Sequence, residues 1–159
     1  MKLGFTLAIL LATLATGCAS SLRTESTSCG QARMLSAEFS GLTVLDVWGA
    51  KQAFAKILID NPGKTTSMLF TSAEAVPVLY RGAYELQKLK NSEWKPAVLV
   101  IEELSRPTTS IKLKPNTLTA IYVNVDGIAT DPTRDQTAIY RVDFATSDGC
   151  RFVSDEFGI

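Results

Sequence analysis

The chain has 159 residues, 46% of them hydrophobic, and its 16 basic and 16 acidic residues leave it formally neutral. Because there is no basic excess, nucleic acid is not expected as a partner. The absence of histidine excludes Ser-His-Asp and Cys-His catalytic groups and the common histidine-containing zinc and copper sites.

The first 17 residues have the features of a secretory signal peptide. Lys2 is followed by an uncharged apolar stretch, LGFTLAILLATLA, which is shorter than the roughly 20 residues that a membrane-spanning helix needs. Small residues then lead directly to Cys18, and the stretch LATGCAS resembles the lipobox of bacterial lipoproteins. In that family the chain is cut before the cysteine, and both its thiol and its new amino group are acylated. The alternative is an ordinary signal peptide in which Cys18 has no such role.

The resemblance to lipoproteins has consequences for the compartment and for the other cysteines. Ala19 rather than Asp follows Cys18, which in Gram-negative lipoproteins implies the outer membrane. The acyl chains would anchor the protein to the bacterial membrane. Acylation of Cys18 leaves Cys29 and Cys150 able to form one disulfide, as exported proteins commonly do.

The chain is therefore expected to have three parts. Residues 1–17 are the signal peptide, residues 18–28 are the acylated cysteine and a flexible polar tether, and residues 29–159 form one folded domain. A disulfide between Cys29 and Cys150 would join the start of this domain to its last strand.

Short runs with period-2 alternation of apolar residues predict an all-β fold. Turn residues separate the runs, as at Asn61–Lys64 and Lys90–Glu93. The second turn predicts a hairpin, in which Trp94 opens the return towards Ala97–Glu103. Helical spacing is confined to about one turn within Gln31–Phe39 and another near Ala73. The predicted strands are Leu42–Trp48, Ala53–Asp60, Ala83–Leu89, Ala97–Glu103, Thr109–Lys114, Leu118–Asp126, Ala138–Ala145 and Cys150–Phe157. Seven or more short strands indicate a β-sandwich or barrel.

Four motifs resemble bacterial immunoglobulin-like domains of small exported lipoproteins, over roughly residues 50–159. They are YELQKLKNSEWKPA (Tyr84–Ala97), IKLKPNTLTAIYVNV (Ile111–Val125), IYRVDF (Ile139–Phe144) and FVSDEF (Phe152–Phe157). Asn116 stands after Pro115 where the family prefers glycine, but asparagine also tolerates positive φ. The resemblance implies an immunoglobulin-like β-sandwich and carries over no active site.

Tyr140 has two possible roles in such a sandwich. Its position two residues before Val142 resembles a tyrosine corner, in which the hydroxyl donates a hydrogen bond to nearby backbone. Alternatively, Tyr140 packs in the core without that hydrogen bond.

Few residues point to a particular site. Asp126, Asp131 and Asp135 lie in one predicted loop, where clustered carboxylates sometimes bind Ca²⁺. Their spacing matches no known calcium loop, so we interpret the loop as solvated and expect no metal. Trp94, next to a turn, is the aromatic residue expected to be exposed, and exposed aromatic residues often anchor interfaces. The candidate interaction surface therefore comprises Trp94, Asp126, Asp131 and Asp135.

These observations lead to a non-catalytic function. We expect a periplasm-facing, outer-membrane-anchored lipoprotein that binds another envelope protein as an accessory subunit, with no cofactor and no small-molecule substrate. One alternative is an inhibitor or immunity protein against a periplasmic toxin or hydrolase. Others are a small histidine-free hydrolase and a structural protein that self-associates through edge strands.

Overall fold

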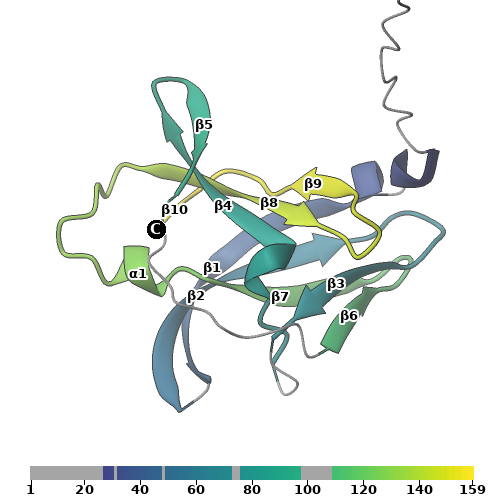
Figure 1. The fold of residues 1–159 in the computed structure, drawn as a ribbon, viewed down its shortest axis with the longest axis horizontal. Coiled ribbons are helices and arrows are strands. Elements are labelled where there is room, and N and C mark those ends of the chain that lie inside the picture. Colours follow the sequence, from purple (N-terminus) through teal and green to yellow (C-terminus); the bar gives the residue numbers. More distant parts are fainter. Residues whose placement is uncertain (1–26, 31, 48, 73–75, 98–108) are drawn as a thin grey trace, which may run out of the picture.

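The computed structural model describes residues 27–30, 32–47, 49–72, 76–97 and 109–159. Most of them form antiparallel strands, with one short α-helix and three short 3₁₀ turns (Figure 1). The predictions for the signal peptide, for Cys18 and for most of the tether lie outside these residues. So do the helical turn near Ala73 and all of the Ala97–Glu103 strand except Ala97.

The predicted all-β class is confirmed by the order of the elements. The strands are β1 (Ser36–Val47), β2 (Ala50–Asp60), β3 (Ser67–Thr71), β4 (Tyr84–Lys90), β5 (Glu93–Pro96), β6 (Thr109–Leu113), β7 (Leu118–Asn124), β8 (Ile139–Ala145), β9 (Arg151–Val153) and β10 (Phe157–Gly158). The helical elements are η1 (Thr27–Gly30), η2 (Ala32–Met34), η3 (Arg81–Ala83) and α1 (Asp126–Ala129).

The first sheet has the strand order β1-β2-β7, and its β1–β2 hairpin contains a bulge. Phe39 pairs with Ile57 and Gly41 with Lys56, so Ser40 is an inserted residue. Gly41 has a φ of +131°, which residues with a Cβ rarely adopt. The insertion moves the core-facing side chains of β1 from odd to even positions. The hairpin also extends past the pairing with β7, which begins only at Phe54 (Figure 1).

A short segment, residues 78–80, connects this sheet to the β3–β6 pair. The Leu79 amide donates to the Tyr122 carbonyl of β7, and the Tyr80 amide donates to the Phe70 carbonyl of β3. On the outer face of the sheet, Val78 of this segment packs with Val47 and Phe54 in a small second core. The segment thereby covers apolar residues that the other sheet cannot reach.

The second sheet has the order β10-β8-β4-β5, with β9 also paired to β8. The predicted hairpin is confirmed: β4 and β5 are joined at Asn91 and Ser92, whose φ angles of 52° and 61° are those of a type I′ turn. The predicted turn at Asn116 is confirmed as well, with a φ of 54°.

The two larger sheets face each other across the main core. Period-2 alternation places Ile121 and Val123 of the first sheet, and Val142 and Phe144 of the second, in this core with no exposed surface. Other members come from the strands at the edges and from the connecting segments, and they include Leu35, Ala37, Leu69, Leu113, Phe152 and Phe157.

The predicted disulfide between Cys29 and Cys150 is present and spans 121 residues of sequence. Cys29 lies in η1, and the buried Cys150 immediately precedes β9. The bond therefore attaches the segment before the first strand to the end of the second sheet.

Candidate protein-interaction surface

The connection from β7 to β8 begins with the short helix α1 and contains all three predicted carboxylates. Asp126 is the first residue of α1, and its Oδ1 accepts a hydrogen bond of 2.8 Å from the Ala53 amide of β2. The Asp126 amide in turn donates to Oδ1 of Asn124 at 3.0 Å. Asp126 thus attaches the start of the loop to the first sheet, and its carboxylate is directed partly towards the protein.

Asp131 and Asp135 form two successive Asp-x-Thr turns. Oδ1 of Asp131 accepts from the Thr133 amide at 2.8 Å and from the Thr133 hydroxyl at 2.7 Å. Oδ1 of Asp135 accepts from the Thr137 amide at 3.0 Å and from the Thr137 hydroxyl at 2.7 Å. These hydrogen bonds stabilise the charged form, so the pKa of each carboxyl is lowered from 3.8, first by the threonine hydroxyl.

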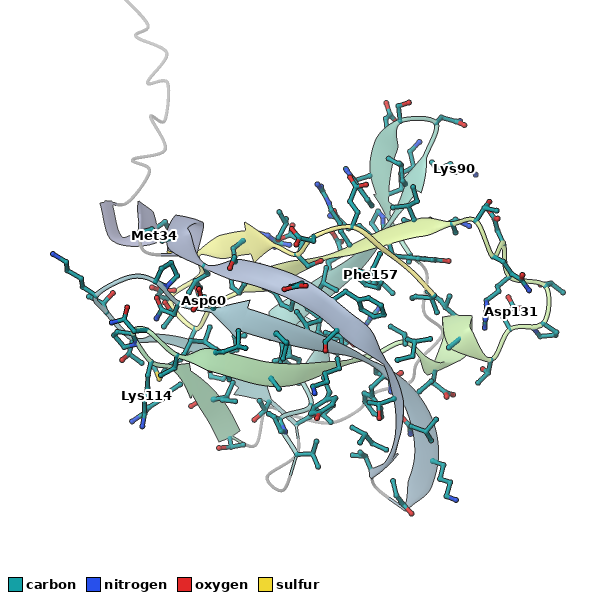
Figure 2. All side chains as sticks on the ribbon, turned by 180° about the vertical axis from the view of Figure 1, so that it is seen from behind. Met34, Asp60, Lys90, Lys114, Asp131 and Phe157 are labelled. Atoms are coloured by element: carbon teal, nitrogen blue, oxygen red, sulfur yellow. A yellow bond between two sulfur atoms is a disulfide. The ribbon has the colours of Figure 1, made fainter. Side chains whose placement is uncertain are left out.

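The loop encloses an open pocket of about 330 Å³ against β4 and β8. Lys88 and Tyr140, which are paired across these strands, line the pocket together with Asp131, Arg134 and Asp135 of the loop. Two cations and two carboxylates therefore share one small cavity. Figure 2 shows Asp131 in the loop at one end of the molecule.

Arg134 and Lys88 are held differently in this pocket. Arg134 donates from Nη1 to the Ala129 carbonyl, while its buried Nε has no hydrogen-bond partner among the described residues. Lys88 is held loosely, because its Nζ lies 3.7 Å from Oδ2 of Asp135 and 5.9 Å from the centre of the Tyr140 ring. The partly exposed Lys88 is therefore held less firmly in the pocket than Arg134.

Tyr140, which lines this pocket, is largely buried. Its ring packs against that of Phe157 in a tilted arrangement, with ring centres 6.4 Å apart. Burial, followed by the negative charge of Asp135, raises the pKa of its hydroxyl above 10.0. Among the described residues, no backbone carbonyl accepts a hydrogen bond from this hydroxyl. The structure therefore favours the core role of Tyr140 over the tyrosine corner.

Trp94 lies on a different surface from the loop carboxylates. It pairs with Leu89, on the outward face of the second sheet, and the guanidinium of Arg141 lies 4.3 Å from the centre of its ring. Arg141 is fixed there because its Nε donates to Oε1 of Gln87 at 2.8 Å. One face of the indole is thus covered by a cation, and the half-buried ring is part of a polar sheet surface.

The structure therefore brings Asp131 and Asp135 together with three residues that the sequence did not single out for a site. Lys88, Arg134 and Tyr140 line the pocket with them, and only the β4–β8 register reveals that Lys88 and Tyr140 are neighbours. Asp126 and Trp94 do not line this pocket. A single sequence contains no pattern that pairs two distant strands, so this part of the site had no local marker.

No protein-family model, curated protein or solved structure matches the chain. Within the described ranges, no helix is both long and apolar enough to cross a membrane. In the same ranges, no three Cys, Asp or Glu side chains come together in a way that could hold a metal ion.

Proposed function

We propose that this chain is an outer-membrane lipoprotein, acylated at Cys18, that binds another envelope protein in the periplasm without catalysing a reaction. Its recognition site lies at the end of the domain where the 126–137 loop and β4 line the pocket. In this proposal the partner is held by the pocket formed by Lys88, Asp131, Arg134 and Asp135.

The observation that carries the proposal is the position of the pocket relative to the start of the folded region. In Figure 1, η1 lies at one end of the long axis of the molecule, and α1 and the loop that follows it lie at the other end. A lipid at Cys18, close in sequence to η1, would therefore hold the first end towards the membrane. The loop would then be directed away from the bilayer, where a partner can reach it.

The chemistry of the pocket supports recognition more than catalysis. A cavity with two cations and two carboxylates can pair with charged side chains of either sign on a partner, and such pairs favour specificity. A general acid at neutral pH needs a raised pKa. The pKa values of Asp131 and Asp135 are instead lowered.

The fold we infer is an immunoglobulin-like β-sandwich. Support comes from two antiparallel sheets that pack through alternating apolar faces, together with the β4–β5 hairpin and the positive φ at Asn116. Such a scaffold presents its loops from a rigid core. The Cys29–Cys150 disulfide reinforces the end of the domain away from the pocket.

Site-specific photo-crosslinking in cells tests this function. A photoreactive residue is placed at Thr133 in the pocket loop, at Trp94 on the outward sheet face, and at Val153 of β9 as a control distant from the loop. We expect one envelope protein to be captured at Thr133, in stoichiometric amount, and not at Val153. A captured hydrolase or toxin would indicate the inhibitor function, whereas equal capture at all three positions or none at Thr133 would contradict the proposed site.

The lipid anchor needs a separate test. Metabolic labelling with an alkyne fatty acid is expected to label the wild-type protein and to leave a Cys18→Ser variant unlabelled. Membrane fractionation should then recover the wild type with the outer membrane. Equal labelling of both proteins would exclude Cys18 as the acylated residue.

A further inference from the structure

The pocket between the 126–137 loop and strands β4 and β8 contains opposite charges that do not form a close ion pair. Nζ of Lys88 lies 3.7 Å from Oδ2 of Asp135, whereas charge-assisted N–H···O hydrogen bonds measure about 2.7 to 2.9 Å. The exposed Lys95–Glu93 pair of β5 is closer, at 3.1 Å. Lys88 and Asp135 therefore share the cavity without neutralising each other at hydrogen-bonding distance.

Two further polar groups of the pocket form no hydrogen bond with the described residues. Oδ1 of Asp131 accepts from the amide and the hydroxyl of Thr133, but Oδ2 of the same carboxylate accepts from none of the described residues. The hydroxyl of Tyr140, which also lines the pocket, donates to none of them. The pocket thus contains both an acceptor and a donor that the described part of the chain does not use.

The balance of charges favours a ligand that carries both signs. Lys88 and Arg134 are cationic, and the lowered pKa values of Asp131 and Asp135 keep both carboxylates charged at neutral pH. A ligand with one charge would meet two opposite and two like charges, so attraction and repulsion would largely cancel. A zwitterion can place each of its charges beside an opposite one. In an α-amino acid these charges are close together, as are Lys88 and Asp135.

The remaining walls of the pocket indicate the size and polarity of the rest of the ligand. Ile128 and Ala97 line it and are packed against the main core, so they form a fixed apolar wall beside the charged groups. The volume of about 330 Å³ is at the lower end of the range of about 300 to 1,000 Å³ that small-molecule pockets have. A small ligand with one apolar group therefore suits this pocket.

From these observations we infer that the pocket binds a free α-amino acid with an apolar side chain. The carboxylate of the ligand pairs with Lys88, its ammonium group pairs with Asp131 and Asp135, and its side chain contacts Ile128 and Ala97. This inference goes beyond the proposed function, because the ligand is a small molecule. It requires neither the lipid anchor nor a protein partner, although a partner would compete with the amino acid for the same pocket.

The test titrates the full-length protein, held in detergent micelles, with L-leucine at about pH 7, where the ligand and all four charged groups are ionised. NMR shifts of the backbone amides report both the affinity and the site. We expect saturable shifts within residues 127–135 and none in β5. The comparison ligands are 4-methylpentanoate, which lacks the ammonium group, 3-methylbutylamine, which lacks the carboxylate, and glycine, which lacks the apolar side chain. Each should bind at least tenfold more weakly than leucine.

Uncharged substitutions then test the two charges of the pocket separately. Lys88→Gln and Asp135→Asn are each expected to weaken leucine binding about tenfold or more. The matched controls are Lys95→Gln and Glu93→Gln, which remove the same kinds of charge from an exposed ion pair of β5. Both controls should bind leucine as the wild type does. Circular dichroism confirms that each variant is folded.

Several outcomes would overturn the inference. These are the absence of saturable shifts at millimolar leucine, shifts that lie outside the pocket, and binding that survives both pocket substitutions. Equal affinity for leucine and any one of the comparison ligands would also overturn it, because the missing group would then not be recognised. Protein capture at Thr133 without leucine binding would support the proposed function and contradict this inference, whereas leucine binding without capture would do the reverse.

Discussion

Phe39 of β1 and Phe157 of β10 stack face to face, with ring centres 4.5 Å apart and ring planes 8° apart. They belong to the outer strands of the two different sheets, so this contact joins the sheets along one side of the main core. Beyond this contact, from Gly41 to Val47, β1 pairs with no strand other than β2 among the described residues.

The stacked pair predicts a measurable coupling in stability. Phe157→Ala is expected to lower the free energy of unfolding by about 3 to 4 kcal/mol, because it removes a buried ring. Combined with Phe39→Ala in a double-mutant cycle, it should show a coupling of about 0.5 to 1.5 kcal/mol. Urea unfolding measures both values, with Val153→Ala as an exposed control. Strictly additive effects would contradict a direct contribution from the stacking.

The disulfide is expected to stabilise the whole domain. It closes a loop with a sequence separation of 121 residues, and the chain-entropy treatment gives an upper figure of about 4 to 5 kcal/mol for a loop of that length. A Cys29→Ser, Cys150→Ser variant should therefore unfold at a clearly lower urea concentration than the wild type. A reducing agent should shift the wild type in the same direction and leave the variant unchanged. Equal midpoints for the oxidised wild type and the variant would show that the bond adds no stability.

The strands that the sequence predicted well are those with one buried face. In β7 and β8, the buried Ile121, Val123, Val142 and Phe144 recur at every second position, with a more exposed residue between the two members of each pair. The first half of β1 was missed because the inserted Ser40 breaks that period. The residues before it have the spacing of about one helical turn, and Ala32–Met34 forms such a turn, whereas Ser36–Phe39 belongs to β1.

β3 was missed for a different reason. Met68 and Phe70 are partly exposed on one face while Leu69 is buried on the other, so apolar residues lie on both faces and no alternation is visible. The loop carboxylates were found because turn residues mark a loop locally. That Asp126 accepts a hydrogen bond from Ala53 depends on long-range packing, which one sequence does not encode in any local pattern.

The lowered pKa of Asp131 is expected to depend on a single hydroxyl. Thr133→Val removes the stronger of the two hydrogen bonds that lower this pKa, so the value should rise towards 3.8, while the pKa of Asp135 stays unchanged. Carboxyl carbon NMR across an acid titration measures both groups. The reciprocal Thr137→Val variant is the control and should move Asp135 alone. Equal shifts of both carboxyls in either variant would show that the two turns are not independent.

The same pKa values predict how stability depends on pH. Because the folded pKa of Asp131 and of Asp135 lies below the unfolded value, ionisation of these groups favours the folded state. Their contribution is present above about pH 3.8 and is lost as the pH falls through the lower, folded pKa. Replacing Thr133 and Thr137 by valine should weaken the dependence of the free energy of unfolding on pH in this acidic range. Above pH 5 the slope of the profile should be unchanged.

Substitutions of Asp126 test whether its carboxylate stabilises the fold or contacts a partner. Asp126→Ala removes the acceptor of the Ala53 amide and should lower the free energy of unfolding by about 1 to 2 kcal/mol, because a partly buried donor is left without its partner. Asp126→Asn keeps an acceptor oxygen and should retain most of the stability. Hydrogen exchange at Ala53 should be faster in the alanine variant than in the asparagine variant. If both variants are as stable as the wild type, the carboxylate does not hold the loop, and Asp126 becomes a candidate contact residue of the interaction surface.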